Sequence, residues 1–95
     1  RILKAETVKN IRTNHTQNIY NEPGDGFVFC FSVILNPDKM DRPGGVGQLQ
    51  WSGYFSTYFF IDPEKKAIGI TLTQQMPGGD NIASPFQNYM YKALN

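Results

Sequence analysis

Hydrophobic and polar positions along the chain predict four strands between two helices. Strands are expected at 27–35, 48–53, 57–61 and 67–73, and helices at about 4–13 and 84–94. The alternation is cleanest in 67–73, where Ile68, Ile70 and Leu72 fall on one face of the strand. The turn at 62–66 is short, so we expect 57–61 and 67–73 to pair as an antiparallel hairpin.

The segment 27–35 is apolar on both faces, because Val28, Cys30 and Ile34 alternate with an equally apolar set. A strand of this kind belongs inside a sheet that is covered on both sides. Turn residues precede it at 22–26, and prolines and glycines make 36–47 a long loop.

The C-terminal helix, which follows a predicted loop at 76–81, carries a complete start signal. Ser84 is the expected N-cap, Pro85 suits the first helical position, and Gln87 completes a capping box. Apolar residues at helical spacing form the stripe expected to pack on the sheet, and they are Phe86, Tyr89, Met90, Ala93 and Leu94. Together these elements predict the α+β class, an antiparallel β-sheet with flanking helices.

Length and charge exclude several classes of function. With 95 residues the chain has room for one small domain. Its formal net charge is +1 and the charges are scattered, so no nucleic-acid partner is expected. No apolar run is long enough to cross a bilayer, so no membrane span is predicted.

Residue types that carry chemistry are sparse. Cys30 is the single cysteine, which rules out an internal disulfide and a cysteine-based metal site, and it is expected to be a small buried hydrophobe. His15 is the only histidine, so a Ser-His-Asp triad within the chain has little support. Asp62 and Glu64 are interpreted as turn and surface residues rather than a catalytic pair. Neither a metal nor a cofactor is expected.

Two short patterns suggest sites. The glycine-rich segment 44–47 lacks the Lys-Ser/Thr pair that must follow a phosphate-binding loop, so that interpretation is set aside. Asn14, His15 and Thr16 match a glycosylation sequon, but no secretion signal supports it.

Spaced motifs in the second half of the chain resemble a known superfamily. They are Trp-Ser-Gly at 51–53, Ser-Thr-Tyr-Phe-Phe-Ile-Asp-Pro at 56–63 and Ile-Gly-Ile-Thr-Leu-Thr-Gln at 68–74, with Gly-Phe-Val-Phe-Cys-Phe at 26–31 before them. In this order they resemble the C-terminal part of serine β-lactamase-related proteins. These include class C β-lactamases, D-alanyl-D-alanine carboxypeptidases and β-lactamase-like carboxylesterases, and the esterase branch is the most similar.

The resemblance implies that residues 1–95 are a single C-terminal fragment of a β-lactamase/transpeptidase-like fold. In that family the nucleophile lies upstream in a Ser-x-x-Lys motif, and a Tyr-x-Asn motif follows it. Neither motif occurs in this sequence. The 95-residue chain is therefore expected to be inactive alone and to need the missing N-terminal part of the same protein. It is also expected to self-associate, because strands that are apolar on both faces need cover.

What remains of the catalytic apparatus is the family's third motif. By resemblance, Trp51, Ser52 and Gly53 are substrate-binding residues, and the backbone N–H of Tyr54 is a donor of the oxyanion hole, as acyl transfer requires. Family members that act on carboxylate-bearing substrates have a Lys where Trp51 stands. Because Trp51 carries no charge, the resemblance favours a neutral small-molecule ester over an amide with a free carboxylate.

Several residues depart from the family pattern by adding bulk. Ser52 and Ser56 stand where the esterase branch has glycine, and Val28 and Cys30 stand where glycines are common. A catalytically inactive binding or structural module with the same fold is therefore the alternative to a hydrolase.

Overall fold

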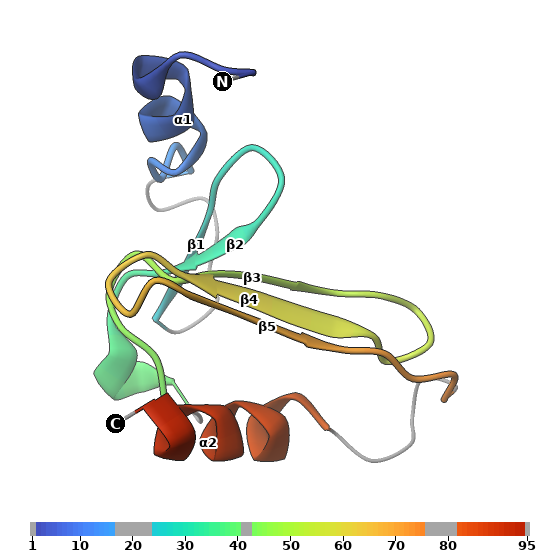
Figure 1. Cartoon of the computed structure of the whole chain (residues 1–95). Coiled ribbons are helices and arrows are strands. Elements are labelled where there is room, and N and C mark those ends of the chain that lie inside the picture. The colour runs from blue at the N-terminus through green and yellow to red at the C-terminus, as the bar shows by residue number, and fades with distance from the viewer. Residues whose placement is uncertain (1, 17–23, 41–42, 76–81, 95) are drawn as a thin grey trace.

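The computed structural model describes residues 2–16, 24–40, 43–75 and 82–94; the predicted loop 76–81 lies outside them. The elements are α1 (Ala5–Ile11), β1 (Asp25–Phe27), β2 (Ser32–Ile34), the 3-10 helix η1 (Pro37–Lys39), β3 (Leu49–Ser52), β4 (Tyr58–Asp62), β5 (Ala67–Thr71) and α2 (Ala83–Leu94). The strands form one sheet in the order β1-β2-β3-β4-β5, every neighbouring pair antiparallel (Figure 1). The predicted α+β class is confirmed.

The single strand expected at 27–35 is wrong, because this segment folds into a hairpin. β1 ends at Phe27 and β2 begins at Ser32, and the N–H of Val28 donates to the carbonyl of Phe31 at 2.9 Å. The turn at the hairpin tip contains no glycine or proline, which is why the sequence pattern missed it. Strand β1 also begins at Asp25, inside the predicted turn 22–26. Pairing within the hairpin satisfies the backbone polar groups that a lone strand would leave open.

Strands β3, β4 and β5 form a meander, and the predicted hairpin of the last two is confirmed by its register from Tyr58↔Thr71 to Asp62↔Ala67. At its turn Asp62 Oδ1 accepts the N–H of Lys65 at 3.0 Å, and Lys66 adopts a left-handed φ of 54°. A carboxylate that accepts a turn N–H is a typical aspartate role in such a turn.

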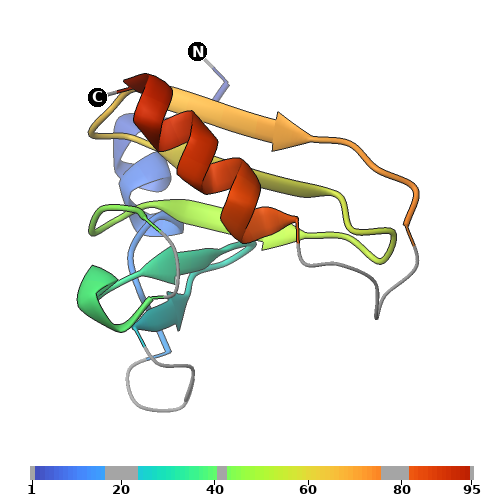
Figure 2. The same ribbon diagram turned by 90° about the horizontal axis from the view of Figure 1, so that it is seen from below.

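Helix α2 crosses one face of the sheet (Figure 2). A buried cluster of Tyr58, Phe60 and Tyr91 forms the core between them, with Ala83, Phe86 and Met90 packed around it. Gly69 is required opposite Phe60, because a β-carbon at Gly69 would overlap the Phe60 ring. We call this covered side of the sheet the α2 face.

The apolar stripe predicted for α2 coincides only in part with the side of the helix that is buried. Tyr89 is 73% exposed, whereas Gln87 and Tyr91 are 0% and 7% exposed. The sheet beneath offers polar partners, so the helix turns these hydrogen-bonding residues inward. Ser84 is not the N-cap, since the helix begins at Ala83, and its buried Oγ has no hydrogen-bond partner in the described part of the chain.

Among the described residues, the opposite side of the sheet is covered only near the β1–β2 hairpin. There Val28, Val33 and Leu49 form a second buried cluster, with Phe31 and Ile61 packed against it. Helix α1 has no buried residue and lies apart from the sheet, beyond that hairpin (Figure 1). Over β3–β5 the side chains of this face stay largely uncovered. We call them the open face, and they are Trp51, Ile68, Ile70 and Leu72, which are exposed, and Phe59, which is half-buried.

Candidate functional site

The four residues predicted to form the site lie at the end of β3. Trp51 and Ser52 close the strand, and Gly53 and Tyr54 begin the turn to β4. The N–H of Gly53 donates to the carbonyl of Thr57 at 2.9 Å, and the N–H of Ser56 donates to the carbonyl of Gly53 at 3.2 Å. All four are exposed, with Trp51 at 46% and Tyr54 at 68%.

The backbone N–H of Tyr54 donates to no backbone carbonyl of the described residues. Tyr54 is the second residue of the four-residue turn closed by the bond from Ser56 to Gly53, and N–H groups at that position need not take part in the turn's own hydrogen bond. The structure thus leaves this N–H able to serve a ligand.

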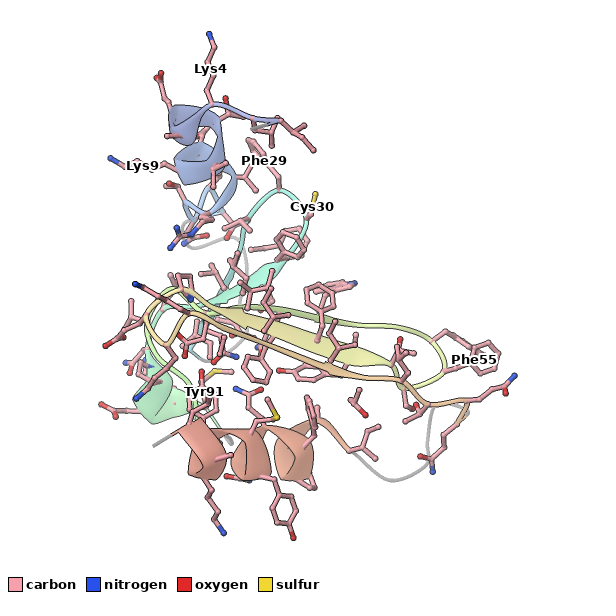
Figure 3. All side chains as sticks on the ribbon, in the orientation of Figure 1. Lys4, Lys9, Phe29, Cys30, Phe55 and Tyr91 are labelled. Atoms are coloured by element: carbon pink, nitrogen blue, oxygen red, sulfur yellow. The ribbon has the colours of Figure 1, made fainter. Side chains whose placement is uncertain are left out.

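Three hydrogen bonds tie the turn to the segment after β5. The Thr73 hydroxyl donates to the carbonyl of Phe55 at 2.6 Å, and the N–H of Gln75 donates to the same carbonyl at 3.1 Å. The Ser56 hydroxyl donates to the carbonyl of Gln75 at 3.2 Å. Phe55 lies at the tip of this β3–β4 connection (Figure 3). These bonds hold the backbone around Tyr54 in one conformation.

Ser56 itself adopts a left-handed φ of 65°. Glycine adopts this conformation freely, whereas a residue with a β-carbon does so at a cost of about 1–2 kcal/mol. This explains in physical terms why a glycine would suit position 56.

A shallow, mainly apolar depression adjoins the turn on the open face. It is lined by Trp51, Ser52, Gly53, Thr57, Tyr58, Phe59, Ile70 and Leu72. Three of the four predicted site residues therefore share one surface with side chains of β5. Trp51 also makes an edge contact with the ring of Phe27, with centroids 5.3 Å apart.

Thr57 stands in one of the motifs that carry the resemblance but was given no site role from the sequence, and it lies against Gly53. A β-carbon at Gly53 would overlap Thr57 Oγ1. Gly53 is therefore needed because the threonine hydroxyl occupies the space of its side chain. Nothing local in the sequence signals this, since the contact depends on how the turn closes.

A buried polar network links the sheet to α2 below the site. We call it the α2 network, and it comprises Gln48, Gln50, Tyr58, Asp62, Gln87 and Tyr91, each at most 7% exposed. The Tyr58 hydroxyl contacts Gln50 Oε1 at 2.7 Å and Gln87 Oε1 at 2.5 Å.

Tyr91 joins the helix end of this network to the β4–β5 turn (Figure 3). Its hydroxyl donates to Asp62 Oδ2 and contacts Gln48 Oε1 at 2.6 Å. Burial, together with the hydrogen bond to the Asp62 carboxylate, raises the pKa of Tyr91 well above its ordinary value. Asp62 is thus a buried residue, 4% exposed, and its interpretation as a surface residue is wrong, while Glu64 is exposed as expected.

The other candidates contribute little to a site. Cys30 is exposed at the β1–β2 tip, so its predicted burial is wrong (Figure 3). His15 stacks on Phe29 with centroids 4.9 Å apart. Asn14 Oδ1 accepts the hydroxyl of Thr16 at 2.8 Å.

The glycines at 44–47 serve packing and turn formation. Gly44 lies directly against the side chains of Ile34 and Gln48, and Gly47 has a φ of 88°. The described residues hold no group of three or more His, Cys, Asp or Glu side chains placed to bind a metal. They also include no helix long and apolar enough to span a membrane.

Comparison with known proteins places this architecture among hydrolases. No protein-family model matches the chain. Two Mycobacterium tuberculosis proteins, Rv1367c and the uncharacterized protein MT1414, are each 30% identical to it over 89 residues, which covers 81% of this chain and 22% of each relative.

A solved structure is also similar. EstCE1, described as a hydrolase with promiscuous acyltransferase activity, matches 92% of this chain and 23% of its own, with a TM-score of 0.74 and 27% sequence identity. The chain therefore spans less than a quarter of the length of the proteins it matches. Its fold is that of a portion of a hydrolase.

Proposed function

We propose that this chain is the C-terminal portion of a β-lactamase-like serine hydrolase of the esterase type. The observation that carries the proposal is the similarity to EstCE1 over 92% of the chain, combined with the exposed Trp51–Tyr54 motif at the end of β3. Acyl transfer from a serine needs hydrogen-bond donors where negative charge develops on the carbonyl oxygen. The Tyr54 N–H, which has no backbone acceptor in the described chain, supplies one such donor.

The substrate is a neutral small-molecule ester. The depression beside the turn is lined mainly by apolar side chains, among them Trp51, Ile70 and Leu72. None of the residues that line it is charged, so a substrate carboxylate would gain no ion pair there. An apolar acyl or alcohol group fits this surface.

The nucleophile and its base come from a preceding part of the same protein. That part also covers the open face, where Ile68, Ile70 and Leu72 are 64%, 61% and 81% exposed. Apolar surface of this extent is typical of an interface rather than of a free surface.

Two substitutions in the longer protein test the role of Tyr54. Tyr54→Pro deletes the N–H, and proline is common at the second position of such turns, so the variant should fold. We expect its kcat on a p-nitrophenyl ester to fall by about 10²–10³-fold. Tyr54→Phe keeps the N–H and should retain kcat within a few fold.

Equal activity of the two folded variants would remove Tyr54 from the oxyanion hole. An unmodified longer protein that hydrolyses no ester and reacts with no serine-directed acylating reagent would instead support the inactive binding or structural module.

A further inference from the structure

The Thr57 side chain is oriented with its hydroxyl, not its methyl group, toward Gly53. Of the atoms that a β-carbon on Gly53 would meet, the nearest is Thr57 Oγ1, and Thr57 Cβ is farther away at 3.7 Å. A hydroxyl in this position lies beside the α-carbon of Gly53, the residue at which the peptide that carries the Tyr54 N–H begins.

This hydroxyl lies on the open face. Side chains two residues apart on a strand point to the same side, so the space above Gly53 is on the same side as Trp51. Thr57 lines the apolar depression together with Trp51 and Leu72. Gly53 lines it as well, so a substrate bound in the depression meets the turn at Gly53 and Thr57.

The hydroxyl is also available to a ligand. Thr57 is partly exposed, and its Oγ1 makes no hydrogen bond within the part of the chain that the structure describes. Its position is held by the backbone, because the Thr57 carbonyl accepts the N–H of Gly53 at 2.9 Å. Thr57 is β-branched, so few rotamers of its side chain are favoured.

We propose that Thr57 is a specificity-determining residue of the same site, and that its hydroxyl donates a hydrogen bond to an oxygen of the bound ester. This inference rests on the proposed function. The Thr57 hydroxyl is then the polar contact beside an otherwise apolar surface. The preferred substrate places its ester group at Thr57 and its apolar group against Trp51 and Leu72. Hydrocarbon-like competitors without an oxygen at that point would bind less well.

The test in the longer protein compares Thr57→Val, which keeps the shape and deletes the hydroxyl, with Thr57→Ser, which keeps the hydroxyl. We expect Thr57→Val to raise KM for a p-nitrophenyl ester by about three- to tenfold with kcat within twofold, as the loss of one neutral hydrogen bond predicts. Thr57→Ser should restore KM. The thermal unfolding midpoints of both variants should match the unmodified protein, which separates ligand contact from a purely structural role. If Thr57→Val fails to fold, Thr57→Ala serves in its place.

An unchanged KM in folded Thr57→Val, with the kcat of Tyr54→Pro still strongly reduced, would overturn the Thr57 proposal and leave the proposed function intact. Equal kcat in Tyr54→Pro and Tyr54→Phe would overturn both the Thr57 proposal and the proposed function.

The position of the Thr57 hydroxyl over Gly53 can also be tested by stability measurements, independently of catalysis. Gly53→Ala should lower the unfolding midpoint, and adding Thr57→Ala should recover at least half of that loss. Absence of recovery would show that the hydroxyl does not lie over Gly53, and would likewise overturn the proposal.

Discussion

The two faces of the sheet invert the usual relation between polarity and burial. On the α2 face, six hydrogen-bonding residues of the α2 network are buried, including Gln48 and Gln87 at 1% and 0% exposure. On the open face, apolar side chains such as Ile70 and Leu72 are 61% and 81% exposed. Buried polar groups are tolerated where they are hydrogen-bonded to one another. An exposed apolar face, in contrast, indicates surface that another segment covers.

This difference in burial indicates that the two faces of the sheet have different roles. On the α2 face both the sheet and the helix supply hydrogen-bond partners to the network, although Nε2 of Gln48 has no partner among the described residues. The open face holds the candidate site, and we propose that a further part of the protein covers it. Substitutions on the two faces should therefore behave differently in the 95-residue chain and in the longer protein.

The largest effect is expected at Asp62 on the α2 face. Its carboxylate accepts the Tyr91 hydroxyl and, at 3.0 Å, the N–H of Lys65. Hydrogen bonds to a charged group contribute about 1.5–3 kcal/mol each. Asp62→Ala should lower the free energy of unfolding by about 3 kcal/mol in urea titrations. Glu64→Ala, at an exposed neighbouring position, should stay within about 0.5 kcal/mol. Equal effects would contradict the claim that the network secures α2.

Gly69 tests the packing of the same face. An added β-carbon would overlap the ring of Phe60, which is fully buried between sheet and helix. Overpacking a tight core costs about 1–3 kcal/mol. We expect Gly69→Ala to lower the unfolding free energy by about 2 kcal/mol in both the short chain and the longer protein. A neutral result would mean that α2 does not press Phe60 against the sheet.

The raised pKa of Tyr91 predicts a loss of stability at high pH. The folded chain holds this hydroxyl proton more tightly than the unfolded chain, whose tyrosines titrate near pH 10. The contribution is therefore fully present below about pH 10 and is lost as the pH rises toward the folded pKa, with a slope of at most about 1.4 kcal/mol per pH unit.

Unfolding titrations between pH 8 and pH 11 measure that slope. Tyr91→Phe should make the slope shallower by the contribution of one titrating proton, which is at most about 1.4 kcal/mol per pH unit. Tyr89→Phe, on the exposed side of the same helix, is the matched control. The interpretation fails if the two variants share one slope.

The smallest effect is expected on the open face of the 95-residue chain. Ile70→Thr replaces a side chain that is already 61% exposed, so its unfolding free energy should change by less than about 0.5 kcal/mol. In the longer protein the same substitution should cost about 1–3 kcal/mol, because the face is then buried. Identical small changes in both proteins would show that nothing covers the open face.

Sequence reasoning recovered the elements whose signals are local. The hairpin of β4 and β5 follows from a short turn between two alternating segments, and both strands lie at the expected places. The β1–β2 hairpin was missed, since Val28 to Phe31 continue the apolar pattern through the turn. Periodicity reports which residues are apolar, and it does not show where a uniformly apolar segment reverses direction.

The motif in the sequence identified the candidate site, but it did not identify the residues that surround the site. Trp51, Ser52, Gly53 and Tyr54 are adjacent in the sequence, so a resemblance could identify them together. The residues that shape their surroundings come from elsewhere. Thr73 fixes the turn from 18 positions beyond Phe55, for example. Such contacts leave no local pattern.

The sequence by itself determined the α+β class, the turn between β4 and β5, and the position of the Trp-Ser-Gly motif, because each depends on residues close together in the chain. Only the tertiary structure decided which side of each element is buried. Gln87 turned inward because Gln48, 39 positions earlier, meets it across the sheet–helix interface. Gly53 proved necessary because the turn brings Thr57 Oγ1 above it. Burial and polar pairing depend on surfaces that folding brings together. The sequence of a single strand or helix does not show which distant residues will contact it.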